Sequence, residues 1–268
     1  MLNVFKYALI ILLSLFLLLC VGIAVYAFVL MKKRPPLALY EERRKQADFI
    51  PLSQIPERMV KLLLEMEDDE FYSHRGFSMG EIRSAVKMNF RAKKVVYGGS
   101  TITQQLAKNL YFDFTHHHLR KAVELLIALE MERKLGKDRI LAFYMNIIYY
   151  GYGVYGITDA AKFYFNKPVA ALTVNQMFMF AVLPTWPTKG NPIQYPDVFE
   201  RCRNKRLNHL MKTKPDQVLS REEAEAILAR HADGLDPELR KADDFTRNYP
   251  KEVPLINERF GPHGRGDC

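Results

Sequence analysis

The feature that most constrains the fold of this chain is an apolar run near its N-terminus. The run from Tyr7 to Met31 carries no charged residue, and about 20 apolar residues suffice to cross a bilayer as a helix. A cleaved signal peptide is the alternative, but its apolar region usually spans roughly 7–15 residues, and no small-x-small cleavage pattern follows Met31. We therefore predict a transmembrane anchor over residues 1–31 and a juxtamembrane linker over residues 32–50.

The net charge of the chain indicates which kinds of partner it can bind. The formal net charge is +9, which suits an anionic membrane surface, an anionic substrate or nucleic acid. No nucleic-acid-binding signature is present, so we predict the membrane and an anionic substrate as partners, and no nucleic acid. Lys6 precedes the apolar run, and Lys32, Lys33 and Arg34 come after it. This count favours a cytoplasmic location for the chain beyond the run, although long domains cross membranes despite such charges.

Helical periodicity dominates from residue 51 onward. Apolar residues recur at helical spacing after Pro56, and glycines and prolines separate the later apolar segments. Alternating patterns typical of strands are scarce. We predict a mainly α domain over residues 51–212, followed by a polar C-terminal extension over residues 213–268.

The first candidate site is an acidic segment around Glu67. Glu67 shares a helical stripe with four apolar residues, Val60, Leu63, Leu64 and Phe71. A carboxylate on such a face is poorly solvated, and further acidic residues crowd positions 65–70. Both effects disfavour the ionised form of this carboxyl, which is the setting of a general base. The alternative is an acidic patch at the exposed end of a helix.

The second candidate site is the segment from Gly98 to Leu110, with the sequence GGSTITQQLAKNL. The two glycines break the chain, and Thr101 followed by Gln104 predicts a capping box that opens a helix. Because the N-terminus of a helix presents N–H groups, it attracts phosphate. Four side chains of the segment add donors or charge: Ser100, Gln104, Gln105 and Lys108. The alternative is an ordinary capped amphipathic helix, and the GxxxxGK[ST] pattern of a P-loop is absent.

Three other polar features lie in the later segments. Glu124 lies near the start of an apolar helix that we predict to be buried nearly all round; it is either a buried acid serving a cleft or an ion-pair partner of Lys121 or Lys108. Asn146 lies in an apolar run, where an amide is more often a satisfied core group than a ligand. The adjacent histidines His116–His118 do not converge on one ion, so we predict no metal site there.

In their order along the chain, these segments resemble the motifs of the peptidoglycan glycosyltransferases, the bacterial enzymes that polymerise lipid II. The resemblance covers roughly residues 50–200, and is to the monofunctional transglycosylases and to the glycosyltransferase half of class A penicillin-binding proteins. The matching segments are Glu67–Gly76, Gly98–Leu110, Arg120–Asn146, Gly153–Phe165 and, more weakly, Leu172–Pro184.

The resemblance implies a fold and a mechanism. The fold is a mainly α, lysozyme-like glycosyltransferase lobe with a smaller membrane-associated jaw region. Glu67 would deprotonate the 4-hydroxyl of the acceptor sugar, whose oxygen attacks the anomeric carbon of the donor with inversion while a lipid diphosphate departs. Glu124 would be the second catalytic residue and would organise the diphosphate region. It would act either directly, with no cofactor, or through a divalent cation such as Mg²⁺ or Mn²⁺.

The resemblance also implies a set of residues that bind the substrate. They are Ser100, Thr101, Gln104, Gln105, Lys108, His116, Arg120, Lys137 and Asn146. A diphosphate leaves without protonation if cations receive its charge, whereas cleavage of an ordinary glycosidic bond usually needs a second carboxyl group as acid. The cationic groups in the second and third motifs therefore favour a transferase over a muramidase-type hydrolase.

Three positions depart from the family pattern. His116 stands where the family usually has arginine, Gly136 where it has serine, and Gln176 where it has glutamate. A histidine is only partly charged near neutral pH, so a catalytically weakened member that binds or scaffolds is a second hypothesis. The expected partners are lipid II, the growing glycan chain and proteins of cell-wall synthesis or division. The expected location is the bacterial cell membrane, with the catalytic domain on the outer face.

Overall fold

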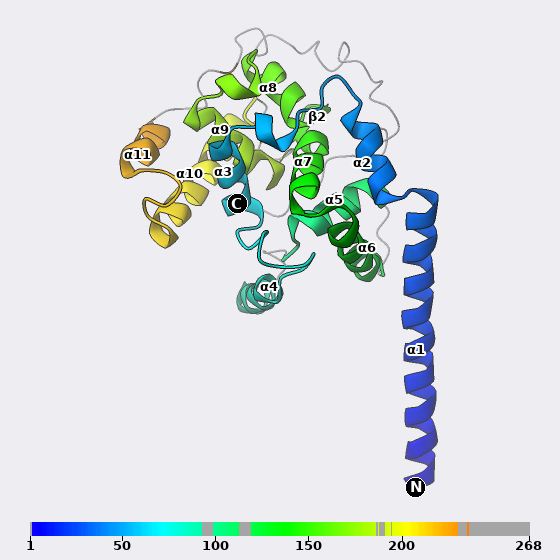
Figure 1. The fold of residues 1–268 in the computed structure, drawn as a ribbon. Coiled ribbons are helices and arrows are strands. Elements are labelled where there is room, and N and C mark those ends of the chain that lie inside the picture. Colours follow the sequence, from blue (N-terminus) through cyan, green and yellow to red (C-terminus); the bar gives the residue numbers. More distant parts are fainter. Residues whose placement is uncertain are drawn as a thin grey trace.

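The computed structural model describes residues 2–92, 99–112, 119–185, 187, 191–193, 195–229 and 235. Most of these residues are helical, which confirms the prediction of a mainly α fold (Figure 1). The elements in chain order are α1 (Leu2–Lys33), α2 (Pro36–Arg44), the 3-10 helix η1 (Leu52–Gln54), α3 (Glu57–Glu67), α4 (Met79–Ala92), α5 (Ile102–Tyr111), α6 (Arg120–Leu135), α7 (Lys137–Ile147), β1 (Tyr149–Gly151), β2 (Val154–Tyr155), α8 (Ile157–Phe165), η2 (Val169–Ala171), α9 (Val174–Val182), η3 (Leu183–Thr185), α10 (Pro196–Thr213) and α11 (Arg221–Ala229).

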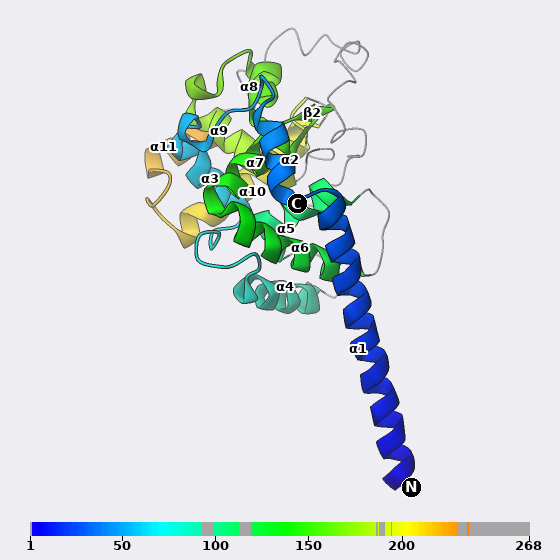
Figure 2. The same cartoon turned by 45° about the vertical axis from the view of Figure 1, so that its right-hand side comes forward.

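Helix α1 extends away from the body of the protein, as Figures 1 and 2 show. Among the described residues it is the one helix that is long and apolar enough to cross a membrane. Its C-terminal part packs on the body, where Ala27 is buried. The Arg34 guanidinium donates to the Leu110 carbonyl oxygen at 2.9 Å, and the Tyr111 hydroxyl donates to the Arg34 carbonyl oxygen at 2.6 Å. These two bonds tie the start of the predicted juxtamembrane linker to the end of α5.

The core is built around α7, in which every residue from Ile140 to Ile147 is buried. Helix α5 packs on α6 and α7, and α3 packs on α9. The prediction that the helix beginning at Arg120 is buried nearly all round is wrong. Helix α6 buries one face, whereas Leu129 on another face is 38% exposed. The buried face includes Glu124, so the acid is carried towards the core by its apolar neighbours.

Helix α3 ends at Glu67, earlier than the predicted stripe implies. Asp68 has φ −168° and leaves the helical conformation. Phe71 is fully buried but reaches the core through the turn after the helix. The change of direction separates two adjacent acids: Glu67 stays on the helix, while Asp68 begins the loop.

A short antiparallel hairpin of β1 and β2 follows α7. Its turn needs positive φ angles, which glycine adopts without strain: Gly151 has φ +95° and Gly153 has φ +75°. Gly156 has φ +79°, and a Cβ atom there would lie 2.5 Å from the Asn146 carbonyl oxygen. The glycines of this segment therefore allow the chain to turn back closely against the end of α7.

Helix α4 lies at the edge of the body towards which α1 extends, in both Figure 1 and Figure 2. Three of its large apolar side chains are exposed: Met79, Ile82 and Phe90, the last at 85%. Exposed apolar side chains on the side towards which α1 extends fit the membrane-associated jaw region that the family resemblance implies.

The chain beyond α10 returns to the N-terminal half of the body. Arg58 on α3 forms an ion pair with Glu223 on α11 and donates to the Val218 carbonyl oxygen at 3.2 Å. Ser220 caps α11, because its hydroxyl accepts from the Glu223 N–H at 3.2 Å. The described part of the predicted C-terminal extension thus packs against α3, the helix that carries Glu67.

Candidate active site

The carboxylate of Glu67 is held by two side chains from distant segments. The Thr185 hydroxyl, in η3, donates to Glu67 Oε1 at 2.6 Å, and Gln105 Nε2, on α5, donates to Glu67 Oε2 at 2.9 Å. The Tyr144 hydroxyl donates to Gln105 Oε1 at 3.2 Å, which fixes the orientation of that amide. Glu67 is half-buried, so its position is fixed while part of it can still be reached from solvent.

Tyr150 lies close enough to Glu67 for the two groups to interact electrostatically. Burial, and secondly the negative charge of Glu67, raise the pKa of Tyr150 above its ordinary value. The phenol therefore stays neutral at physiological pH. Its hydroxyl is buried and has no hydrogen-bond partner among the described residues. The surroundings of Glu67 thus combine neutral donors with a buried aromatic ring, and no cation is among the hydrogen-bond partners of Glu67 in the part of the chain that the structure describes.

The predicted crowding of acids around Glu67 is relieved by Lys214. Lys214 Nζ donates to Glu65 at 2.7 Å and to Asp69 at 2.9 Å. Burial alone would lower the pKa of Lys214, but its hydrogen bonds to these two carboxylates outweigh that effect and raise it. One cation from the C-terminal segment therefore bridges two of the neighbouring carboxylates and offsets part of their negative charge, and the sequence pattern does not single it out.

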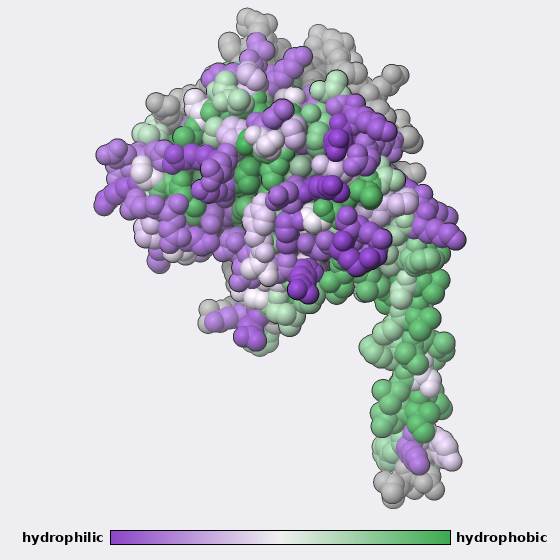
Figure 3. All heavy atoms as spheres, in the orientation of Figure 1, coloured by the Kyte–Doolittle hydropathy of each residue, from purple (hydrophilic) through white to green (hydrophobic). Residues whose placement is uncertain are grey.

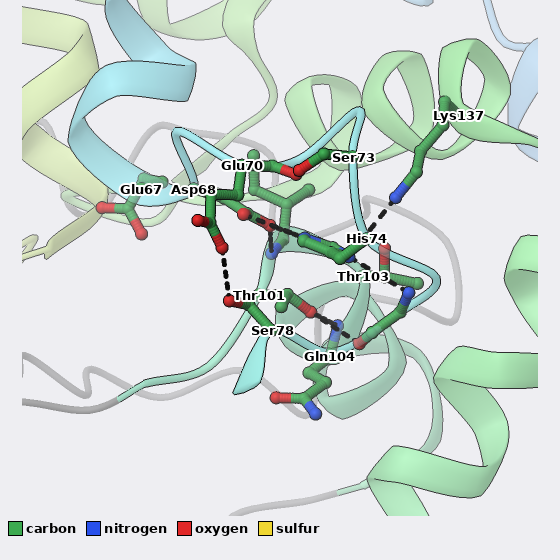
Figure 4. Close-up of polar contacts among 12 residues, drawn as sticks. Glu67, Asp68, Glu70, Ser73, His74, Ser78, Thr101, Thr103, Gln104 and Lys137 are labelled. Carbon is green, nitrogen blue, oxygen red and sulfur yellow. Dashed lines mark hydrogen bonds and ion pairs between the residues drawn. The ribbon is translucent and has the colours of Figure 1, made fainter. Parts of the chain in front are cut away.

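Asp68 has a different environment from its neighbour. Its side chain is fully buried, and both of its oxygens lie 3.0 Å from His74 Nε2. The N–H of Ile102 donates to Asp68 Oδ2 at 2.8 Å. Because the Gly76 N–H donates to His74 Nδ1 at 3.1 Å, Nε2 is the nitrogen that carries the proton towards Asp68. Figure 4 shows these contacts, with Glu67 pointing away from them.

The N-terminus of α5 is occupied by protein groups, so it is not the open phosphate site that the sequence predicts. Thr101 caps the helix, accepting from the Gln104 N–H at 3.2 Å, but the predicted capping box is only half formed, because Gln104 Oε1 accepts from Lys121. Asp68 takes the N–H of Ile102. Thr101 is buried and donates to the Gly76 carbonyl oxygen at 2.8 Å. Thr101 therefore joins two loops and does not face a ligand.

A cluster of charged side chains lies beside the next residues of α5. Lys121 Nζ donates to Ser100 Oγ at 2.7 Å and to Gln104 Oε1 at 3.0 Å, and lies 3.3 Å from Glu124 Oε2. Arg120 Nε lies 3.0 Å from Glu124 Oε1. We call these five residues the cation cluster. Two cations and one carboxylate leave it with an excess positive charge, which suits a negatively charged ligand.

Glu124 is the buried acid of this cluster, and its contacts decide whether it could hold a metal ion. Its Oε1 atom is in the ion pair with Arg120 but has no well-directed hydrogen bond. It is the single carboxylate of the cluster, and no group of three His, Cys, Asp or Glu suitable for a metal occurs within the described residues. Magnesium is usually held by one or two carboxylates together with oxygens of substrate phosphate and water, but both oxygens of Glu124 are already paired with Arg120 and Lys121, whose positive charges oppose a further cation. We therefore derive no step through a metal.

The two glutamines of α5 connect the two features. Gln105 contacts Glu67, and Gln104 belongs to the cation cluster, where it accepts from Lys121. Successive residues of a helix are about 100° apart, so α5 presents the carboxylate and the cations at adjacent parts of its surface. Lys108, one turn beyond Gln104, is half-buried.

Lys137, which the resemblance places among the substrate-binding residues, contacts groups outside the cation cluster. Its Nζ donates to Glu132 at 2.8 Å and lies 4.3 Å from the centre of the Phe71 ring. It also lies 3.5 Å from His74 Nδ1. In Figure 4 it approaches His74 from the side opposite Glu67. Its described contacts link α6 and α7 to the loop after α3, and none is to the cation cluster.

Asn146 is a core amide, which is the alternative that its apolar surroundings favour. Its Nδ2 donates to the carbonyl oxygens of Ile50 and Ala142, each at 2.8 Å, and its Oδ1 accepts from the Ile50 N–H at 3.0 Å. It is buried and joins the linker to α7, so both ends of its amide are used within the protein, and its contact with substrate stays a prediction. The remaining predicted residue, His116, lies outside the described residues.

Comparison with known proteins identifies the family of this chain. The sequence pattern of the family described as Transglycosylase matches residues 35–212, the part of the chain that carries both Glu67 and the cation cluster. The chain belongs to the transglycosylase family.

Curated relatives of the chain are penicillin-binding proteins. Penicillin-binding protein 4 of Bacillus subtilis is 36% identical over 212 residues, which are 79% of this chain and 32% of the relative. Penicillin-binding protein 1F of the same organism is 40% identical over 160 residues, covering 60% of this chain and 22% of the relative. The chain thus spans about a third or less of these relatives. A crystal structure of penicillin-binding protein 1A from Haemophilus influenzae aligns with a TM-score of 0.39 and 22% identity, over 67% of this chain and 17% of the other.

Two departures from the transglycosylase pattern have local structural explanations. Gly136 joins α6 to α7 with φ +73°, a conformation in which a serine would be strained. Gln176 completes a capping box with Thr173 at the start of α9, and glutamine serves this role as glutamate does. Neither residue is among the described contacts of Glu67 or the cation cluster.

Sequence reasoning missed two residues of the candidate site. Thr185 is 118 positions from Glu67, and no local pattern marks a threonine after Pro184 as a donor to a carboxylate. Lys121 is predicted only as an ion-pair partner of Glu124. Its position three residues before Glu124, together with the polar residues of the second motif, is the signal that could have placed it in the site.

Proposed function

We propose that this chain is a peptidoglycan glycosyltransferase that builds glycan strands from lipid II with inversion of the anomeric centre. Family membership supports transfer of glycosyl groups in peptidoglycan synthesis. The finer proposal depends on one observation: successive residues of α5 contact Glu67 and the cation cluster. A base and an anion site in adjacent positions suit a reaction in which a hydroxyl attacks while a diphosphate leaves.

In the proposed reaction, Glu67 is the general base. It takes the proton of the acceptor 4-hydroxyl while the oxygen forms a bond to the anomeric carbon of the donor. Thr185 and Gln105 hold the carboxylate in one orientation by hydrogen bonds at 2.6 and 2.9 Å. A fixed base saves the cost of orienting it during the reaction, and a positioned base accelerates proton transfer by about 10²–10⁴-fold.

The bond that breaks joins the anomeric carbon to the diphosphate oxygen, and the electron pair leaves with the diphosphate. Arg120 and Lys121 are positioned to receive this charge, with Ser100 and Gln104 as neighbouring polar groups. Glu124 holds both cations in place from its buried position on α6. Because these cations belong to the protein, we propose that the reaction requires no metal, and that a chelator leaves the rate unchanged.

The proposed setting is the outer face of the bacterial cell membrane. Helix α1 would span the bilayer, and α4 would rest against it with Phe90 and Met79 in contact with lipid, since both are exposed. The donor is then a lipid in the same membrane, and the acceptor is lipid II or a growing lipid-linked glycan chain.

The test is the formation of polymer from purified lipid II by the full chain. We expect lipid II to be consumed and Lys121→Gln to lower the rate by about 10²–10³-fold, as loss of a transition-state donor typically does. Lys61→Gln is the matched control, because Lys61 is an exposed lysine that pairs with Glu57 on α3; its rate should equal that of the wild type. Release of soluble fragments from cell wall, without consumption of lipid II, would overturn the proposal in favour of a hydrolase.

A further inference from the structure

A groove lies between α1 and the start of α6, next to the candidate active site. It encloses about 600 Å³, a volume typical of small-molecule sites. Its lining includes Leu19, Gly22 and Tyr26 on one side, and Phe112, Arg120 and Val123 on the other. In Figure 3 α1 is hydrophobic along most of its length, and hydrophobic surface continues onto the body beside it.

The groove stays open because of its residue pattern. Ile23 is half-buried and Ala27 is fully buried against the body, so α1 docks through these positions. Gly22 lies beside them, and a Cβ atom added there would meet nothing within 4 Å. A glycine in a membrane helix often allows a neighbouring helix to approach. Here the space beside Gly22 is left unfilled.

The position of the groove determines what can fill it. Its α1 wall, from Leu18 to Tyr26, lies within the uncharged run from Tyr7 to Met31, which places it at the depth of hydrocarbon chains if α1 spans the bilayer. Water has no polar partners along such a wall. A hydrocarbon chain is therefore the occupant that matches the chemistry of this wall.

One residue belongs to both the groove and the cation cluster. Arg120 lines the groove, and its Nε lies 3.0 Å from Glu124. Its side chain remains 27% exposed. The next residue, Lys121, contacts Ser100 and Gln104. An apolar groove thus opens directly beside a cluster with excess positive charge.

We propose that this groove binds the polyprenyl chain of the donor, with the diphosphate at the cation cluster and the first prenyl units between α1 and α6. This inference rests on the proposed function. A lipid diphosphate carries its charge and its chain on one molecule, and Arg120 lies where one part of the protein meets the other. The anchor is therefore part of the substrate site as well as a tether.

The test fills the groove without disturbing the fold. Gly22→Phe places a ring in the open space, and Ala24→Phe is the matched control. Residue 24 is exposed and lies two positions, or about 200°, around the helix from Gly22. Initial rates are measured for the full-length variants with lipid II carrying a long polyprenyl chain and with an analogue carrying two prenyl units. We expect Gly22→Phe to raise the KM for the long-chain substrate about tenfold and to leave the KM for the short-chain analogue unchanged. Ala24→Phe should match the wild type for both.

A second measurement identifies the occupant directly. A photoreactive benzoylphenylalanine at Leu19 should cross-link to long-chain polyprenyl diphosphate in detergent, and added phospholipid should not compete. Cross-linking to phospholipid alone would overturn the inference, as would equal kinetics of Gly22→Phe and Ala24→Phe. Failure of the proposed function gives a different result, because no variant and no wild-type protein would then consume either form of lipid II.

Discussion

Glu67 and Asp68 are adjacent acids with contrasting surroundings. The carboxylate of Glu67 is half-buried and is held by the side chains of Thr185 and Gln105. The carboxylate of Asp68 is fully buried and binds His74 and the N–H of Ile102. The Asp68 carboxylate caps α5 and orients the imidazole of His74, so its oxygens already accept hydrogen bonds from the protein. A carboxylate held at a partly exposed site can still accept a proton from a substrate, so the contrast separates a structural acid from the proposed base.

Among the variants that test this contrast, Glu67→Gln should show the largest loss of rate. Glutamine keeps the shape of glutamate but is not a base, so polymer formation from lipid II should fall by about 10²–10⁴-fold. The free energy of unfolding should change little, because no buried cation depends on this carboxylate among its described partners. Initial rates and urea unfolding of the same preparation measure both quantities.

Asp68→Asn is the matched variant at the adjacent position. Loss of the charge weakens the hydrogen bonds to His74 and to the Ile102 N–H, and hydrogen bonds to charged groups contribute about 1.5–3 kcal/mol each. We expect a lower free energy of unfolding but a rate, per folded molecule, well above that of Glu67→Gln. If Asp68→Asn proves fully stable and inactive while Glu67→Gln is active, the assignment of the two acids must be exchanged.

A pair of threonines sharpens the same comparison with a smaller effect. Thr185 donates to Glu67, and Thr103 donates to Glu132, each at 2.6 Å and each from a buried position. Thr185→Val removes one of the two donors that orient the base, so the rate should fall about tenfold, equivalent to about 1.4 kcal/mol of transition-state stabilisation. Steady-state kinetics should place most of this loss in kcat.

Thr103→Val removes a hydrogen bond of the same length from a carboxylate that Lys137 still pairs with at 2.8 Å. It should lower the free energy of unfolding by about 1 kcal/mol and leave the rate unchanged. Equal losses of rate in the two valine variants would show that the donor to Glu67 has no special role.

Whether the sequence predicts the role of a residue depends on how far along the chain its contact partners lie. The cap at Thr101 is predictable, because it depends on residues three positions apart. Gln105 is predicted near the chemistry from its motif. The occupation of the α5 N-terminus by Asp68 is not, because the two atoms come from residues 34 positions apart. Helical periodicity gives the face of a residue but not the segment that packs against it.

Asn146 shows the same limit for a core residue. An amide in an apolar run is compatible with both a ligand contact and a structural role. The linker decides between these roles, because the backbone of Ile50 pairs with both polar ends of the amide. The contact joins residues 96 positions apart, and its existence depends on how α2 and the linker cross α7. Local sequence does not encode that crossing.

The smallest expected effect concerns Lys214, which bridges the acids on either side of Glu67 and Asp68. Glu65 lies on α3 before Glu67, and Asp69 follows Asp68. Lys214→Met should lower the free energy of unfolding by about 1 kcal/mol or less at neutral pH, the range for ion pairs open to solvent. The pKa of Lys214 is raised above its ordinary value of 10.5. Its contribution is therefore complete below about pH 10.5 and is lost as the pH rises through the pKa of the folded state.

The difference in unfolding free energy between wild type and Lys214→Met should consequently be constant from pH 7 to pH 9 and shrink above pH 10.5, which urea unfolding at pH 7, 9 and 11 measures. The same variant tests whether crowded acids tune the base, because it leaves Glu65 and Asp69 without the cation that bridges them. If Thr185 and Gln105 set the environment of Glu67, the pH dependence of the polymerisation rate should match that of the wild type. A displaced pH–rate profile would instead show that charges other than the hydrogen-bonded partners of Glu67 control its reactivity. The neighbouring acids would then influence Glu67 directly, and the contrast between Glu67 and Asp68 would not explain the choice of base by itself.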